Sequence, residues 1–281
     1  MREITLRELQ LFSLEIMKDI HKFCENNGIE YSLLDGSLIG AIRHQGFIPW
    51  DDDIDIVMRR PDFERFCKTY KSDEYQLKYR GNGQDCMVPF ARVYDVKRTV
   101  IKTTAPWCLD EVGVWVDVMP ADNVIDDVEQ FGKYYDESRK LWLRSASSRT
   151  AYAPFLRDKS LKYNFKLLIK KILFLNGRRT DHYLLKVMNR ASAMPWGSTA
   201  YWGQLTSMGD NIKGHHRMEI FDHTVLKSFE DTQFYVMNGY DKYLRDNYKD
   251  YMQLPPENKR VPHYADRTKF FWKDETSEIS K

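Results

Sequence analysis

The acidic run WDDDIDIV, residues 50–57, precedes and enters a predicted β-strand. Residues two apart in a strand share a face, so Asp53 and Asp55 project together while Ile54 and Ile56 face the core. Two neighbouring carboxylates repel strongly unless a cation lies between them. Hard oxygen ligands suit Mg²⁺ or Mn²⁺, which usually also coordinate substrate phosphates. The run therefore predicts a strand that carries a divalent-metal site.

A third carboxylate is expected from Asp117, the one charged residue of an apolar strand predicted at residues 112–118. A lone aspartate in such a strand is costly to bury without a partner. We therefore expect Asp117 to lie beside Asp53 and Asp55 and to complete a three-carboxylate metal site.

A possible phosphate cradle is formed by Gly36 and Ser37, between a predicted buried strand at residues 29–34 and a predicted helix beginning at Leu38. Ser37 is the expected N-cap of that helix. Such a turn presents backbone N–H groups and a hydroxyl to an anion. Glycine allows a close backbone approach, and the helix dipole favours a phosphate.

The order of these features resembles the signature of the nucleotidyltransferase superfamily: strand, Gly-Ser turn, helix, Asp-x-Asp strand, then a lone strand aspartate. The resemblance implies an α+β fold, with a small mixed sheet flanked by helices. We expect residues 1–281 to form a single catalytic unit. Its parts are a core at about 29–120, a helical, basic insertion at about 126–194, and a C-terminal segment at about 195–267 that completes the site.

A longer resemblance is to the LicD family. It is carried by LLDGSLIGAIRHQGFIPWDDDIDIVMRRPDFERF (33–66), ARVYD (91–95), VWVDVMP (114–120) and YDKYLRDNYKDYMQLPPENKRVPH (240–263). It spans most of the chain and thins in the helical middle. The chain departs from the family at 229–231, where the family often has Phe-Glu-Gly, and at 248–250, where a Tyr-Gly pair is common. Both departures lie away from the predicted metal centre and concern substrate detail.

The resemblance implies a transferase that moves a phospho-alcohol, with phosphocholine as the best choice, from a CDP-activated donor to a glycan hydroxyl and releases CMP. The implied partners are a CDP-alcohol, with CDP-choline first, and a glycan or lipid-linked glycan such as teichoic acid, lipopolysaccharide or capsule. Asp53, Asp55 and Asp117 are the expected catalytic and metal-binding residues, and Asp117 is our first choice to accept the proton of the acceptor hydroxyl. The expected substrate-binding residues are Gly36, Ser37, Arg43, Asp52 and Arg92.

Two other functions fit the same pattern. A nucleotidyltransferase would attach a nucleoside monophosphate to a small molecule, sugar or protein and release pyrophosphate through an identical metal site. A catalytically inactive protein of this fold would act as a binding module. Such proteins commonly lose a carboxylate, whereas Asp53, Asp55 and Asp117 are all present here.

Several aromatic and basic side chains near the motifs have two interpretations each. Trp50, Trp107 and Trp115 are candidates to bind a quaternary ammonium group by cation–π contact, and packing is at least as good an interpretation of each. His44, Arg260 and His263 are candidates for substrate contact. We do not expect a zinc site at His215 and His216, because no second ligand pair lies near them in sequence.

Composition and charge place the chain in a broad class. The formal net charge is only +2, which gives no reason to expect a nucleic-acid partner. The four cysteines are widely spaced, as expected of reduced thiols in the cytoplasm. The first 20 residues resemble an amphipathic helix and not a signal peptide, and no run of about 18 apolar residues predicts a membrane span. We therefore expect a cytoplasmic enzyme, with a location at the inner face of the membrane as an extension of that expectation.

The segment at residues 157–179 has eight basic residues and one acidic residue, Asp158. Five apolar residues fall near one helical face: Leu161, Phe165, Leu168, Ile172 and Leu175. A basic amphipathic helix can lie on an anionic membrane. We slightly favour the alternative, in which the helix packs its apolar stripe on the protein core.

Other elements follow from periodicity and turn signals. We expect helices at 5–27, 62–70 and 240–251, strands at 54–58, 89–96 and 99–103, and a strand at 112–118 that is ended by Pro120. The helix expected at 5–27 has Gly28 as its predicted C-cap. The polar tail after Thr268 is expected to fray.

Overall fold

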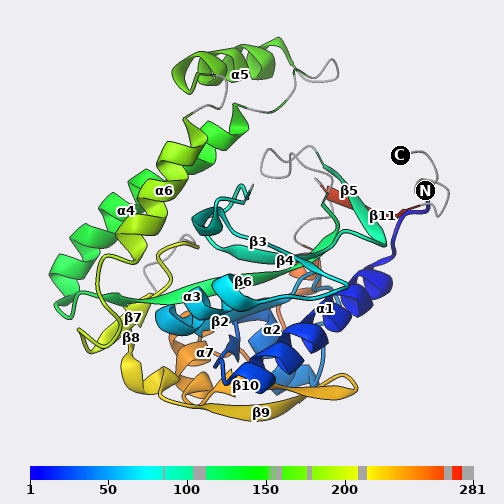
Figure 1. Ribbon diagram of the computed structural model, residues 1–281, viewed down its shortest axis with the longest axis vertical. Helices are drawn as coiled ribbons and strands as arrows, with labels where there is room; N and C mark the ends of the chain where they lie inside the picture. The colour runs from blue at the N-terminus through cyan, green and yellow to red at the C-terminus, as the bar shows by residue number, and fades with distance from the viewer. Residues whose placement is uncertain are drawn as a thin grey trace.

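The computed structural model describes residues 1–84, 86–103, 112–151, 153, 155, 160–175, 179–207, 214–262 and 268–273, and the fold is α+β. A mixed sheet lies at its centre, in the order β1-β2-β6-β4-β3, with β7 and β8 continuing from β6 (Figure 1). β2 and β6 are parallel, whereas the other neighbouring strands are antiparallel. The bounds of these strands are β1 Ser32–Leu33, β2 Asp55–Arg59, β3 Gln76–Lys78, β4 Ala91–Asp95, β6 Val114–Val124, β7 Tyr201–Gly203 and β8 His216–Arg217.

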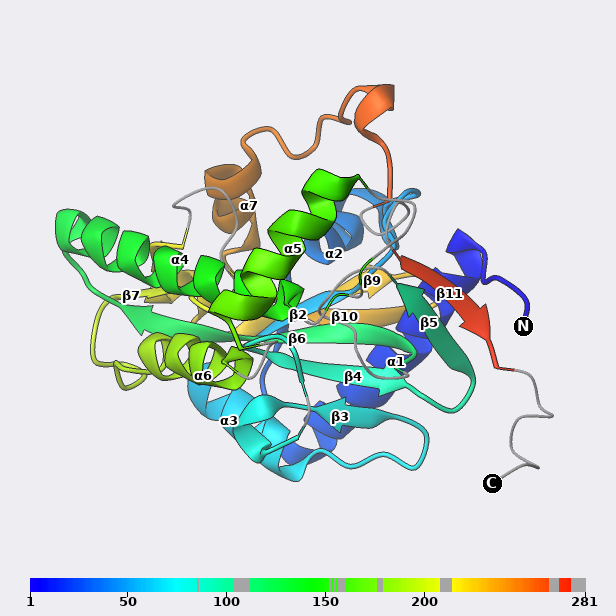
Figure 2. The same ribbon diagram turned by 90° about the horizontal axis from the view of Figure 1, so that it is seen from above.

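Two helices, α1 (Leu6–Asn27) and α3 (Arg60–Thr69), pack against one face of this sheet (Figures 1 and 2). Thr5 caps α1 in a capping box with Glu8, and Gly28 ends the helix in the left-handed conformation, as the sequence predicts. The buried stripe of α1 faces β6 and β4. The apolar face of α1 thereby builds the main core beneath the strands that carry the acidic residues.

Strand β6 is longer than the sequence predicts, because Pro120 does not end it. Every residue of β6 is buried, and the strand continues to Val124. β4 pairs with β6 only as far as Val118, and β7 joins at Asp122. Pro120 therefore lies where that side of β6 has no neighbouring strand, and its missing N–H interrupts no ladder there.

Two antiparallel strand pairs lie outside the main sheet. β9 (Thr224–Phe229) pairs with β10 (Thr232–Met237), and β5 (Thr99–Thr103) pairs with β11 (Thr268–Trp272). The expectation that the chain frays from Thr268 is wrong for β11, which hydrogen-bonds to β5 and continues the ordered fold. Residues beyond 273 lie outside the described part of the chain.

The chain between β6 and β7 forms three helices: α4 (Val128–Thr150), α5 (Leu161–Leu173) and α6 (Thr180–Ala191). α4 and α6 lie side by side and extend away from the sheet, and α5 crosses their far end (Figures 1 and 2). We call these three helices the helical arm. A small apolar cluster of its own, which includes Phe131, Tyr135 and Ala191, holds the base of the arm. Within the described ranges, no helix of the protein has both the length and the apolar character needed to cross a membrane.

Candidate functional site

The central sheet places two carboxylates and one guanidinium in a row across three strands. Asp55 of β2 is in register with Asp117 of β6, and Asp117 is in register with Arg92 of β4. Arg92 donates from Nε to Asp117 Oδ1 at 2.5 Å and from Nη2 to Oδ2 at 3.3 Å. Register partners point to the same face of a sheet, so the strand pairing itself brings Asp55, Asp117 and Arg92 together.

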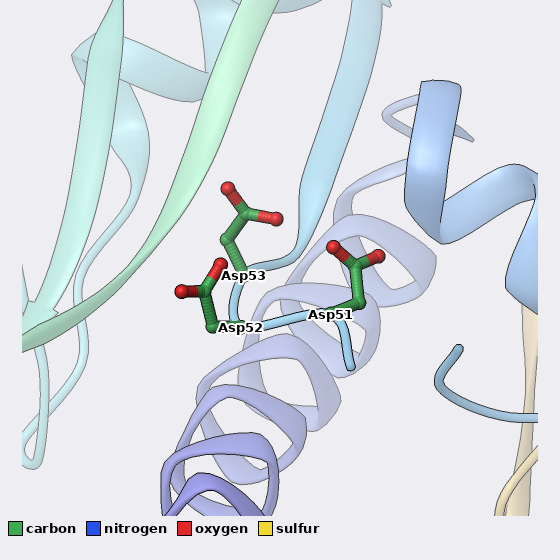
Figure 3. Close-up of side chains that lie close together, drawn as sticks. All are labelled: Asp51, Asp52 and Asp53. Carbon is green, nitrogen blue, oxygen red and sulfur yellow. The ribbon is translucent and has the colours of Figure 1, made fainter. Parts of the chain in front are cut away.

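Three carboxylates gather on the chain that leads into β2. Ligand oxygens of Asp51, Asp52 and Asp53 lie within 4.8 Å of one another, and their side chains project from one short stretch before the strand (Figure 3). Among the acidic, histidine and cysteine side chains that the structure describes, these three lie close enough together to hold one ion. Asp53 belongs both to this cluster and to the set that the sequence predicts, whereas Asp55 and Asp117 lie on the adjoining strands.

The loop that carries the cluster is held by α1. Gln10, a buried residue of that helix, donates its amide N–H to the backbone oxygen of Asp51 at 2.9 Å and approaches that of Ile48 at 3.4 Å. Sequence reasoning missed Gln10, and its only signal is an uncharged amide within the buried stripe of an amphipathic helix. Gln10 positions the loop and carries no charge of its own.

Negative charge is concentrated in this region. Burial, together with the neighbouring charges of Asp51, Asp52 and Asp117, holds the pKa of Asp53 well above its ordinary value, and Arg92 opposes this shift. Burial and the charges of Asp53, Asp117 and Asp35 raise the pKa of Asp55 in the same way. The site therefore holds more carboxylate than its one buried arginine neutralises, and an additional cation would relieve that repulsion. A hard oxygen donor set of this kind fits a divalent metal ion.

The Gly36-Ser37 turn lies directly against the acidic loop. A Cβ on Gly36 would come within 2.8 Å of Asp51 Oδ2, so a larger residue here would require the Asp51 carboxylate to shift. The prediction that Ser37 caps the following helix is wrong: α2 (Asp35–Ile39) begins three residues earlier than expected, with Leu34 as its N-cap. The buried Ser37 hydroxyl instead accepts a hydrogen bond from the Asp55 N–H at 3.0 Å. Ser37 thus fixes the first residue of β2.

Asp35 is a site residue that the sequence did not single out. It has a positive φ of 43° at the start of α2, and its Oδ1 accepts a hydrogen bond from the Tyr243 hydroxyl at 2.8 Å. A hydrogen bond to Asp35 also raises the pKa of Tyr248, after the larger effect of burial. Both tyrosines belong to α7 (Tyr240–Tyr248), so this contact joins the C-terminal segment to the acidic site. No local pattern could have revealed a pairing between residues so distant in sequence.

Arg43 makes a second connection to the C-terminal segment. It lies in a π-helical turn, Gly40–His44, that follows α2. Its Nη1 donates to the backbone oxygens of Tyr251 at 2.5 Å and of Gln253 at 3.3 Å. In this arrangement Arg43 holds the C-terminal loop, and its guanidinium is directed to carbonyl groups.

The tryptophans proposed to bind a cationic group have different surroundings. Trp115 is only 3% exposed and packs between Arg92 and Phe270, so it is a residue of the hydrophobic core. Trp50 is half-buried, and the Arg260 guanidinium lies 5.5 Å from its ring centroid. Trp107 and His263 lie outside the described residues.

His44 and the adjacent pair His215 and His216 make contacts within the protein. Burial, followed by the charge of Arg43, lowers the pKa of His44. The distance from Arg43 Nε to His44 Nδ1 is 3.4 Å. His215 stacks between Tyr201 and Phe131, with ring centroids 3.9 and 4.7 Å away. In the part of the chain that the structure describes, neither His215 nor His216 belongs to a cluster able to hold a metal ion.

A pocket of about 210 Å³ opens beside the acidic loop. Its lining includes Asp52 together with Ile4 and Leu9 from the N-terminal region and Lys269 and Phe270 from β11. Asp52 therefore connects the carboxylate cluster to a cavity with both apolar and charged walls.

Comparison with known proteins identifies relatives of this chain. A family model described as LicD/FKTN/FKRP, nucleotidyltransferase domain, matches residues 28–104, which include the Gly-Ser turn, the acidic loop and Arg92. Shorter matches are to uncharacterised proteins of Rickettsia typhi, 40% identical over 68 residues (23% of this chain and 22% of that protein), and of Rickettsia prowazekii, 48% identical over 48 residues (17% and 18%). The lipopolysaccharide cholinephosphotransferase LicD of Haemophilus influenzae is 32% identical over 274 residues, which are 94% of this chain and 97% of that protein. Because this similarity extends over nearly the whole of both proteins, the chain belongs to the LicD family of transferases.

Proposed function

We propose that this protein transfers phosphocholine from CDP-choline to a hydroxyl of a cell-surface glycan and releases CMP. The observation that carries the proposal is the 32% identity, over nearly all of both chains, to a protein named as a lipopolysaccharide cholinephosphotransferase. The acidic site supports it, because carboxylates next to a glycine turn suit a metal-assisted reaction at phosphorus. We further propose that the central sheet with its β2–β6 pair is the nucleotidyltransferase-like core of the family.

A divalent ion, Mg²⁺ or Mn²⁺, fits the carboxylates Asp53, Asp55 and Asp117, with Asp51 and Asp52 close by. When bound, such an ion supplies charge neutralisation and orientation for the pyrophosphate of the donor. The raised pKa values of Asp53 and Asp55 support this assignment, because crowded carboxylates are those that a cation stabilises most.

In the proposed reaction, the acceptor hydroxyl oxygen forms a bond to the phosphorus of phosphocholine, and the bond from that phosphorus to the bridging oxygen of CMP breaks. The hydroxyl proton passes to a carboxylate of the site. Arg92 already donates to both oxygens of Asp117, and we therefore now favour Asp55 over Asp117 as the proton acceptor. Gly36 lets the Asp51 carboxylate lie directly against the turn. Ser37, Gln10 and Arg43 hold the surrounding backbone in place.

We propose a cytoplasmic location for the reaction. The three cysteines that the structure describes are free and buried, as in proteins that keep reduced thiols. The proposed acceptor is a glycan or lipid-linked glycan, in line with the name of the Haemophilus influenzae relative.

The test is calorimetric titration of the purified protein with CDP-choline, CDP-glycerol, CDP-ribitol and CTP, with and without Mg²⁺. The inactive control is the double variant Asp53→Asn/Asp55→Asn, and the matched surface control is Asp73→Asn, which changes an exposed carboxylate. We expect metal-dependent binding with a preference for CDP-choline, lost in the double variant and kept in the surface control.

Product analysis separates the remaining alternatives. Release of CMP with a phosphocholine-bearing glycan supports the proposal, whereas release of pyrophosphate from CTP identifies a nucleotidyltransferase. Binding of a nucleotide without turnover on any glycan acceptor, combined with unchanged binding in the double variant, would indicate a binding module.

A further inference from the structure

Helix α5 of the helical arm presents an unusually apolar outer surface. Leu161, Phe165 and Ile172 are 90%, 62% and 67% exposed, and Leu168 and Ile169 are also exposed. At 100° per residue these five side chains fall on one side of the helix. The expectation that this stripe packs on the protein core is therefore wrong, since Leu167 is the one residue of α5 that is buried.

The orientation of α5 is fixed from the opposite side. Lys171 donates from Nζ to the backbone oxygen of Ala151 at 2.7 Å, and Lys170 donates to the Thr150 hydroxyl at 3.2 Å. Both acceptors lie at the end of α4. These two contacts, together with buried Leu167, hold one side of α5 against the arm and direct the apolar side outward.

Positive charge flanks the apolar side. Lys162 and Lys166 are exposed on α5, and residues 160–175 include no acidic residue. Over residues 157–179 the chain has eight basic residues and one acidic residue. A protein partner of the same composition would meet this charge unfavourably, whereas an anionic lipid surface complements both the lysines and the apolar stripe.

The position of α5 in the molecule allows contact with a flat surface. It crosses the far end of α4 and α6, at one extreme of the long axis (Figure 1), and the view along that axis shows it lying over the arm (Figure 2). Its 13 residues give a rod of about 20 Å. A helix of this length can lie in the membrane interface without the rest of the protein entering it.

We propose that α5 docks the protein onto an anionic lipid bilayer, with Phe165, Ile172 and their neighbours inserted among the lipids and Lys162 and Lys166 at the headgroups. This docking does not depend on the transfer reaction. Its consequence for the proposed function is that an acceptor anchored in a bilayer would be met at the surface where it lies.

The experiment is cosedimentation of the full-length chain with vesicles of phosphatidylcholine alone or with phosphatidylglycerol. One test variant, Lys162→Glu/Lys166→Glu, reverses the flanking charge, and the other, Phe165→Ser/Ile172→Ser, removes apolar surface. Their matched controls change exposed residues of α4 and α6 on the same arm: Lys140→Glu/Lys186→Glu and Leu143→Ser/Leu185→Ser.

We expect the wild type and both controls to bind vesicles that contain phosphatidylglycerol and to leave pure phosphatidylcholine largely in solution. The charge-reversal variant should bind at least about thirtyfold more weakly, because each lysine contributes about a fivefold factor and the new glutamates add repulsion from the anionic surface. The variant Phe165→Ser/Ile172→Ser should weaken binding by a similar or larger factor, because it removes apolar surface that would be buried among the lipids.

Equal weakening by the arm controls would overturn the proposal, since a general charge effect would explain it. Absence of vesicle binding by the wild type would also overturn it. Concentration-dependent dimerisation that only Phe165→Ser/Ile172→Ser abolishes would show that a second copy of the chain covers α5 instead. CDP-choline binding measured in parallel separates these outcomes from a failure of the proposed function, because no α5 residue belongs to the acidic site.

Discussion

At the scale of single residues, the crowding of Asp53 and Asp55 has a measurable cost in the absence of metal. Folding raises the pKa of both carboxyl groups, which means that their charged forms are less favourable in the folded protein than in the unfolded chain. At neutral pH each carboxylate therefore destabilises the metal-free fold. We expect Asp53→Asn and Asp55→Asn each to raise the free energy of unfolding of the metal-free protein by on the order of 1 kcal/mol. Thermal denaturation in a chelator measures this change.

The same variants should lose the stabilisation that Mg²⁺ gives to the wild type, because ligand binding raises stability only where a site remains. Asp73→Asn is the control and should behave as the wild type in both conditions. A fall in stability of both asparagine variants in chelator would mean that the two carboxylates stabilise the fold through contacts other than with a cation.

His216 gives a residue-scale prediction about pH. It is 5% exposed and packs against Tyr243 and Trp202, with ring centroids 4.8 and 5.0 Å away. Burial lowers its pKa to about 4, whereas the unfolded chain protonates it near its ordinary value of about 6.5. The fold therefore holds neutral His216, and its contribution to stability is present above pH 6.5 and falls as the pH drops from 6.5 to 4.

The measurement is urea denaturation of the wild type and of His216→Gln between pH 7 and pH 4. We expect the wild type to lose up to about 3 kcal/mol more than the variant over this range. His223→Gln, which changes an exposed histidine, should follow the wild type. Parallel pH profiles for the wild type and His216→Gln would show that His216 is protonated in the folded protein.

At the scale of elements, the segments that could be predicted from sequence are those whose own residues carry a clear apolar periodicity or a terminal signal. α1 has a long amphipathic stripe, a capping threonine and a terminal glycine, and β2 has alternating isoleucines after the acidic run. β9 and β10 were missed because the turn between them, Glu230-Asp231, has no glycine or asparagine to signal it. β11 was missed although its three aromatic residues favour a strand, because its partner β5 lies more than 160 residues earlier and no turn signal marks the pairing.

The candidate site follows the same division. The carboxylates of the acidic loop and of β6 are visible in the sequence, because charge inside an apolar strand is itself a local signal. The pairing of Arg92 with Asp117 and that of Asp35 with Tyr243 are not, because each depends on how distant elements pack.

The β9–β10 turn supports an element-scale prediction. Glu230 has a φ of 54°, and its Oε1 accepts a hydrogen bond from the Phe47 N–H at 3.2 Å, on the chain that leads to the acidic loop. Arg7 donates to the same carboxylate at 2.6 Å, from a side chain that is 54% exposed. The turn thus fastens the loop, and Glu230 occupies a backbone conformation that glycine adopts more easily.

We expect Glu230→Ala to lower the free energy of unfolding by about 1–2 kcal/mol, because it leaves the Phe47 N–H without this acceptor. It should also weaken metal-dependent donor binding through the loop. Arg7→Ala removes the exposed ion pair and a hydrogen bond to Gln10 Oε1 but leaves the Phe47 contact intact, and it should cost less than about 1 kcal/mol. Equal effects of the two variants in denaturation and calorimetry would place the contribution in the ion pair and not in the backbone contact.

At the scale of the whole molecule, two apolar clusters of very different size divide the stability. The main cluster joins α1, α3, α7 and the central sheet and includes Met188 of α6. The rest of the helical arm is held by a small cluster around Phe131, Tyr135 and Leu205. β6 continues from one cluster to the other, with Val124 in the smaller one. Fewer buried apolar side chains hold the arm, so we expect it to open locally at a lower free energy than the sheet.

Hydrogen exchange of the native protein tests this division. Amides of α4 and α6 should exchange at least about tenfold faster than those of α1 and of β6 up to Val118. Phe131→Ala, at a side chain with no exposure, should raise exchange further in α4 and α6 by removing about 3 kcal/mol of packing, and should leave α1 unchanged. Phe66→Ala is a substitution of equal size in the main cluster. It should instead raise exchange in the central sheet, in α1 and in the arm, because the arm packs on the sheet and opens when the sheet does. If Phe131→Ala raises exchange in α1 as much as in α4, the arm and the sheet unfold as one cooperative unit and α5 is carried on a rigid support.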